Sequence, residues 1–114
     1  MTDKETLVQL ALGTLPMENF LNIVHEATSK EVLLRAGKLF ASMGNAKEGK
    51  DADAITNAFF GNPHTPTKLK SYIMAARQLQ VIMANRRLGA FPRFHACAAQ
   101  KSVDKTYKEL LEDD

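Results

Sequence analysis

The spacing of the apolar residues is the feature that most constrains the fold of this chain. They recur at intervals of three and four residues, the period of an α-helix, and no segment alternates apolar and polar residues as a half-buried strand does. Glycine and proline fall singly between the periodic segments, as short connections do. Helices without a sheet must pack on one another, so we predict an all-α fold: a single-domain, irregular antiparallel bundle of about five to seven helices with one long central helix.

Capping and turn signals divide the chain into these helices. Thr28 with Glu31 forms a capping box, and Thr65 before Pro66 is typical of an N-cap followed by a first helical residue. The segment "GAFP" predicts a break, because the residue before a proline is biased away from the α region. The expected helices cover 2–13, 16–28, 28–44, a short segment that follows a loop at 45–53 and ends at Gly61, the longest helix at 66–89, a short helix at 94–99, and a last one capped by Ser102.

The longest expected helix is apolar on two opposite sides. One broad face carries Leu69, Tyr72, Ile73, Ala76, Leu79, Ile82 and Met83. Met74, Val81 and Leu88 lie near the other side. A helix of this kind is central in a bundle or faces a partner. These three residues are therefore a candidate interface with a partner helix or a second copy of the chain, and the alternative is that neighbouring helices cover both faces.

Length and composition are typical of one globular domain that folds without disulfides or metal ions. The chain has 114 residues, 45% hydrophobic and 25% charged, which is ordinary for one domain and too apolar for a disordered tail. Its single cysteine, Cys97, has no partner for an internal disulfide, and the N-terminal residues lack the basic and apolar regions of a signal peptide. No apolar run approaches the roughly 20 residues that cross a bilayer. We expect a soluble, cytoplasmic protein that does not bind membranes.

The net charge of +2 conceals a strong segregation along the domain, which spans 1–114. Residues 1–60 carry six cations against eight anions, residues 61–103 carry seven cations and no anion, and the tail at 109–114 is acidic. Such segregation is an argument about partners, not about the fold. The seven cations are Lys68, Lys70, Arg77, Arg86, Arg87, Arg93 and Lys101.

This basic segment predicts contact with a polyanion, because lysines and arginines that neutralise phosphates release counterions. Arg86, Arg87 and Arg93 bracket the predicted break, so we expect them to gather at one end of the long helix, and Phe91 and Phe94 are candidates for stacking on unpaired bases. The sequence leaves DNA and RNA open. The competing interpretations are that the phenylalanines are core residues and that the cations pair in space with the acidic N-terminal half.

Catalytic and metal sites have little support. His95 and Cys97 are two residues apart, so on a helix they point away from each other, and His25 and His64 are isolated from them. The glycine-rich motifs that cradle nucleotides are absent, and the fit to a helix-turn-helix is poor. We expect no enzyme, no cofactor, no metal and no small-molecule substrate. The predicted function is nucleic-acid binding through a basic helix end, and the alternative is a protein-interaction module, an adaptor or inhibitor that can be homodimeric.

Overall fold

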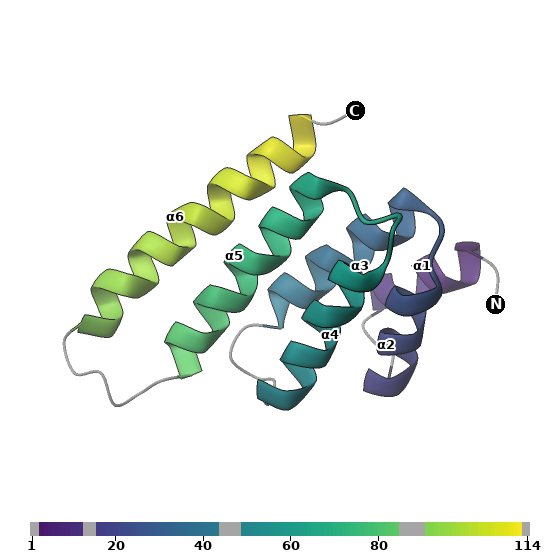
Figure 1. Cartoon of the computed structure of the whole chain (residues 1–114), viewed down its shortest axis with the longest axis horizontal. Coiled ribbons are helices and arrows are strands. Elements are labelled where there is room, and N and C mark those ends of the chain that lie inside the picture. Colours follow the sequence, from purple (N-terminus) through teal and green to yellow (C-terminus); the bar gives the residue numbers. More distant parts are fainter. Residues whose placement is uncertain (1–2, 13–15, 44–48, 85–90, 113–114) are drawn as a thin grey trace.

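Figure 1 shows a computed structural model of the chain, which describes residues 3–12, 16–43, 49–84 and 91–112. Within these ranges the protein consists of six helices and has no strand. This confirms the predicted all-α bundle. The helices are α1 (Asp3–Leu12), α2 (Met17–Glu26), α3 (Lys30–Ser42), α4 (Gly49–Gly61), α5 (Thr67–Ala84) and α6 (Phe91–Glu112).

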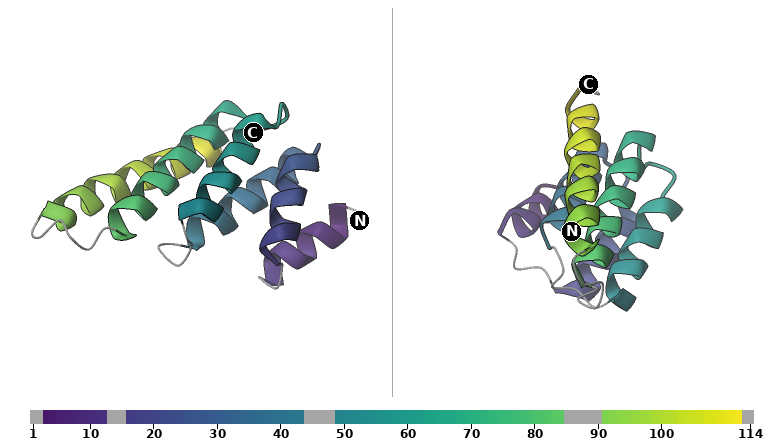
Figure 2. Two further views of the ribbon diagram at one scale, coloured as in Figure 1. Left: turned by 60° about the horizontal axis from the view of Figure 1, so that its bottom comes forward. Right: turned by 90° about the vertical axis from the view of Figure 1, so that its left-hand side faces the viewer.

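The molecule measures 47 × 30 × 24 Å along its principal axes. The helices stack in chain order along the longest of these axes (Figure 1). Helix α1 packs on α3, α2 on α4, α3 and α4 on α5, and α5 on α6. Figures 1 and 2 show the N-terminal helices at one end of this stack and α6 at the other. Helix α5 packs on α3, α4 and α6, but Met74 and Val81 on its second apolar side stay exposed, so a central position covers only one of the two apolar sides.

The core lies where α2, α3, α4 and α5 meet. The rings of Phe40 on α3 and Phe59 on α4 are 6.3 Å apart and tilted by 54°, which is within the range of favourable aromatic pairs. Burying one such side chain stabilises the fold by about 1.5–3 kcal/mol. The largest fully buried side chains are Phe20, Phe40, Phe59, Leu33, Ile55, Leu69, Ile73 and Val24.

Gly37 allows α3 and α5 to approach closely. A Cβ atom at this position would lie 2.7 Å from Leu69 Cδ1 and 3.4 Å from Ile73 Cδ1. The first distance is shorter than real Cβ contacts, so any side chain here would push the two helices or their side chains apart.

A buried asparagine joins the end of α2 to the connection between α4 and α5. Asn62 is 3% exposed, and its Nδ2 donates to the carbonyl oxygens of Val24 (2.8 Å) and Ala27 (2.7 Å). Its Oδ1 accepts from the backbone N–H of His64 at 2.8 Å. The last carbonyls of a helix have no partner within the helix, so this one side chain satisfies groups that burial would otherwise leave unpaired.

Helix α6 corrects two predictions. The helices expected at 94–99 and from Ser102 onward are one continuous helix of 22 residues, which is longer than the 18 residues of α5. No glycine or proline follows Pro92, and in the first turn of a helix the missing N–H of a proline costs little. Ser102 therefore lies within the helix, and its carbonyl oxygen accepts from Thr106 Oγ1 at 2.9 Å.

Three predicted boundaries are also wrong by a few residues. Ser29, not Thr28, caps α3, and its Oγ accepts from the backbone N–H three residues on at 3.5 Å. Helix α5 begins at Thr67, and the Oγ1 of Thr65 has no hydrogen-bond partner among the described residues, so Thr65 is not its cap. Helix α4 begins at Gly49, inside the predicted loop.

Candidate functional site

Helices α5 and α6 form an antiparallel hairpin at one end of the stack. The end of α5 and the start of α6 lie at the far end of this hairpin, away from α1 and α2 (Figures 1 and 2). At its other end Tyr72 and Tyr107 pair at 5.8 Å between ring centroids, and the Lys38 ammonium of α3 lies 5.6 Å from the Tyr107 ring. We call residues 79–84 of α5 and 96–101 of α6 the hairpin end.

The hairpin end contains no carboxylate, since the chain has none between 61 and 103. Lys101 is exposed there. The first carboxylate beyond it is Asp104, whose Oδ1 accepts from Gln100 Nε2 at 3.0 Å. Arg86 and Arg87 lie outside the described residues. The first turn of α6 includes Phe91, Arg93 and Phe94, whose side chains are not among those described.

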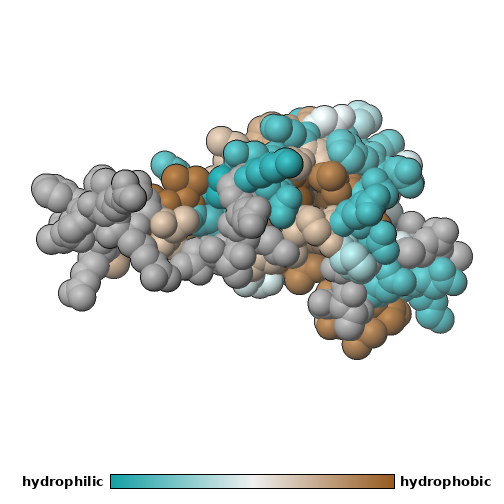
Figure 3. Space-filling model, turned by 90° about the horizontal axis from the view of Figure 1, so that it is seen from below, coloured by the Kyte–Doolittle hydropathy of each residue, from teal (hydrophilic) through white to brown (hydrophobic). Residues whose placement is uncertain are grey.

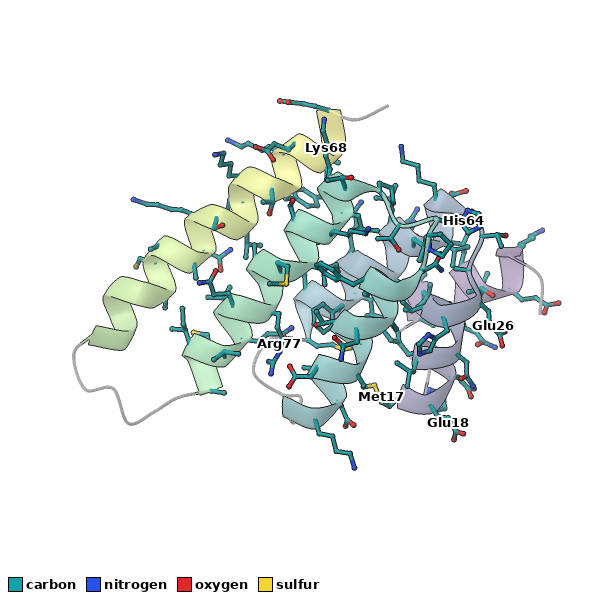
Figure 4. The ribbon with its side chains drawn as sticks, in the orientation of Figure 1. Met17, Glu18, Glu26, His64, Lys68 and Arg77 are labelled. Atoms are coloured by element: carbon teal, nitrogen blue, oxygen red, sulfur yellow. The ribbon has the colours of Figure 1, made fainter. Side chains whose placement is uncertain are left out.

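The other predicted cations do not join this end. Lys68 and Lys70 lie in the first turn of α5, and Figure 4 shows Lys68 and Arg77 well apart along the helix. Arg77 Nε is 2.9 Å from Asp53 Oδ1, with side chains 17% and 66% exposed respectively, so a carboxylate of α4 already offsets its charge. Of the four predicted cations whose side chains are described, only Lys101 therefore lies at the hairpin end.

Met74 and Val81 lie seven residues apart on the same face of α5, with Gln78 between them. Met74 is 52% and Val81 49% exposed, and Gln78 is exposed as well. In the single chain the neighbouring helices thus leave this open face of α5 uncovered. Leu88, the third predicted interface residue, lies outside the described residues. Figure 3, seen from below, shows hydrophobic side chains in separate areas among hydrophilic ones.

A groove of about 410 Å³ lies at the hairpin end, on the side of α5 opposite its open face. Such a volume is within the range of about 300–1,000 Å³ that is typical of small-ligand sites. Its walls come from three helices and carry no charged side chain among the lining residues. These residues are Ala41 of α3, Ala76, Leu79, Gln80 and Met83 of α5, and Ala96, Cys97 and Gln100 of α6.

Gln80 is the polar residue that sequence reasoning missed. It is 3% exposed, and its Nε2 donates to the carbonyl oxygen of Phe40 at 3.0 Å. This bond fixes the orientation of the amide, because the opposite orientation would set two acceptors against each other. Its Oε1 is buried and has no hydrogen-bond partner among the described residues. The sequence held a signal: Gln80 follows Ile73 and Ala76 on the apolar face of α5, where a polar side chain needs a partner.

The described residues offer little other chemistry. Cys97 is exposed, His25 and His64 are exposed on different elements, and no group of three or more metal-ligating side chains occurs in the described ranges. Burial, and then the charges of Tyr107 and Asp104, raise the pKa of Tyr72 above 10.0.

None of the helices in the described part of the chain has both the length and the apolar character needed to cross a membrane. Comparison with protein-family models, with curated proteins and with solved structures gives no match.

Proposed function

We propose that this protein binds nucleic acid at the hairpin end of α5 and α6, where Lys101 and its neighbours in the sequence Arg86, Arg87 and Arg93 contact the phosphates. The observation that carries the proposal is the segment 61–103, with seven cations and no anion, which includes all of α5 and half of α6. Along the chain no carboxylate lies between Asp53 and Asp104, so no residue of this segment repels a phosphate. Each cation that contacts a phosphate releases counterions, so affinity comes without base readout and falls with salt.

Removal of the arginines that lie between the two parts of the hairpin end in the sequence tests this proposal. The variant Arg86→Ala/Arg87→Ala/Arg93→Ala removes three cations from the segment, and Lys4→Ala/Arg35→Ala/Lys50→Ala removes three exposed cations from the acidic half of the chain. Fluorescence anisotropy with labelled duplex DNA, single-stranded DNA and RNA at about 50 and 200 mM salt gives the salt slope of binding.

The wild type should bind with an affinity that falls steeply between the two salt concentrations. Because each phosphate contact contributes about 0.7–0.9 to the logarithmic salt slope, the first variant should lower the slope by about 2–3, and the matched control should leave it nearly unchanged. Binding that is absent at low salt, or equally weakened by both triple variants, would reject the proposal.

Self-association through the open face of α5 is a second candidate function, favoured by the exposure of Met74 and Val81. In this arrangement the open faces of two copies pack against each other, and the symmetric dimer doubles the basic hairpin end. Val81→Glu should dissociate such a dimer in sedimentation velocity. The matched control is Val8→Glu on α1, since Val8 is 50% and Val81 49% exposed. A wild type that stays monomeric at high protein concentration would eliminate this candidate.

A further inference from the structure

A cleft between α1 and α3 combines apolar walls with two cations. Its volume is about 230 Å³. A water molecule takes up about 30 Å³ in the liquid, so the cleft has room for about eight groups of that size, more than the four carbon atoms of a leucine side chain. The lining residues are Leu10 and Ala11 of α1 and Arg35, Lys38, Leu39 and Ser42 of α3. The cleft is therefore large enough for one aliphatic side chain.

The cations of the cleft are available to an occupant. Arg35 is exposed and forms no ion pair with the described residues, although Glu31 precedes it by about one turn of α3. Lys38 contacts a ring instead of a carboxylate, since its ammonium lies 5.6 Å from the centroid of Tyr107. Carboxylates form strong, charge-assisted hydrogen bonds with such groups. An occupant that fits the cleft therefore carries carboxylates beside an apolar side chain.

Two exposed side chains of α1 extend the apolar surface beside the cleft. Val8 is 50% and Leu12 67% exposed. Val8 is three residues from Ala11 and four from Leu12, so the three side chains lie on one side of α1. A chain of phosphates would pair with the cations of the cleft but leave these apolar side chains in water. A protein segment is therefore the better occupant.

The end of α6 has the features that the cleft requires. Leu111 is 56% exposed, Glu112 is exposed as well, and the sequence continues with Asp113 and Asp114. Within one chain this leucine stays outside the cleft. Its neighbour Leu110 packs in the core and holds the helix end, and successive side chains of a helix point about 100° apart. A second copy of the chain can present the same leucine and carboxylates to the cleft.

We infer that two copies of the chain form a symmetric dimer in which the α6 end of each copy enters the cleft of the other. Leu111 fills the apolar part, and the carboxylates that follow it lie beside Arg35 and Lys38. In one chain Lys38 contacts Tyr107, and Leu111 follows Tyr107 by four residues, about 6 Å along the helix. Cleft and helix end are thus neighbours on one surface, so one two-fold axis forms both contacts at once. This interface goes beyond the proposed function and uses no residue of the open face of α5.

Sedimentation velocity of the full chain tests the dimer with two variants. The cleft variant, Ala11→Glu/Arg35→Glu, places two carboxylates in the cleft at exposed positions. The helix-end variant, Leu111→Ser/Glu112→Lys, removes the leucine and reverses one charge. An exposed ion pair changes affinity by up to about fivefold, and a symmetric dimer contains each contact twice, so each variant should weaken the dimer by about tenfold or more.

Matched controls make similar changes elsewhere on the surface. Lys50→Glu reverses an exposed cation of α4, and Met74→Ser removes a side chain that is 52% exposed, close to the 56% of Leu111. Both should leave the dimer constant nearly unchanged. Because Met74 lies on the open face of α5, this control also separates the two modes of self-association. Urea midpoints show whether every variant is folded.

A mixture of the cleft variant and the helix-end variant tests the pairing itself. Each variant alone has lost both contacts of the symmetric dimer. In the mixture the intact α6 end of the cleft variant enters the intact cleft of the helix-end variant, and in the other contact the introduced lysine faces the introduced glutamates. The two variants should therefore form a heterodimer. Resonance energy transfer between a donor on Cys97 of one variant and an acceptor on Cys97 of the other measures it, since the chain has one cysteine and it is exposed.

The outcomes decide the inference as follows. A wild type that dimerises, two variants that do not and a mixture that does support it. A wild type that is monomeric at about 1 mM protein, or a mixture without energy transfer, overturns it. Dimerisation that Met74→Ser abolishes and the helix-end variant leaves intact also overturns it, and assigns self-association to the open face of α5. Nucleic-acid binding is measured independently, so the proposed function stands or falls without the dimer.

Discussion

Replacing Asn62 by alanine should lower the free energy of unfolding by about 3 kcal/mol. The substitution removes three side-chain hydrogen bonds, two donated to the carbonyls of Val24 and Ala27 and one accepted from the N–H of His64. Each contributes about 1 kcal/mol, and the groups left behind are at least partly buried. With an m-value of about 2 kcal/mol/M, the midpoint of urea unfolding should fall by about 1.5 M.

The matched control is Asn57→Ala, which removes the same side chain from an exposed position of α4 and should change stability by less than about 0.5 kcal/mol. Asn62→Asp provides a second control. It keeps an acceptor for His64 but turns a carboxylate oxygen toward two carbonyl oxygens, so at neutral pH it should be at least as destabilising as alanine. If Asn62→Ala lowered the midpoint no more than Asn57→Ala, the junction would not contribute to stability as we argue.

Four further substitutions test helix packing, the surface ion pair and the burial of a tyrosine. Gly37→Ala should lower the free energy of unfolding by about 1 kcal/mol, because overpacking against α5 outweighs a helix-propensity gain of about 1 kcal/mol. Gly61→Ala should raise the free energy of unfolding by about 0.4–1 kcal/mol, because no atom lies within 4 Å of the new Cβ. Thermal unfolding measures both changes. Arg77→Ala should lower the free energy of unfolding in urea by at most about 1 kcal/mol, and by less in about 1 M salt, because the side chain of its partner Asp53 is 66% exposed. A larger decrease would contradict a surface ion pair. In the folded protein the pKa of Tyr72 is raised above 10.0, chiefly by burial, so the stability that neutral Tyr72 contributes is lost as the pH rises through this raised pKa. Tyr72→Phe should therefore lose less stability at alkaline pH than the wild type. Identical pH profiles of the free energy of unfolding would refute this.

Much of the helical architecture could be predicted from the sequence because helix periodicity and breaker residues are local signals. Gly61 ends α4, and the broad apolar face of α5 predicts its buried residues Leu69, Ile73 and Ala76. The failures arose where two local signals compete. Ser102 resembles a cap, yet a serine inside a helix is tolerated when nothing nearby stops the helix, and α6 continues through it.

The candidate site was less accessible to sequence reasoning, since it depends on contacts between distant residues. The charge segment was visible in the sequence, but the pairing of Arg77 with Asp53 joins residues 24 apart and removes one cation from the predicted group. The groove likewise combines α3, α5 and α6, and only the packing shows that the amide of Gln80 reaches the Phe40 carbonyl and leaves its oxygen unpaired.

The stacking of the helices in chain order also determines how the protein can fold. Since helices pack mainly on the next helix or the next but one, most contacts join residues that are close in sequence, and such low contact order favours fast folding. Helix α6 packs chiefly along α5 and adds Leu110 to the core cluster, so its detachment as a unit would remove Leu110 and leave the pair of Phe40 and Phe59 between α3 and α4. Because α6 supplies one wall of the groove, anything that binds there also holds this last helix in place, and slower amide exchange along α6 would report the binding.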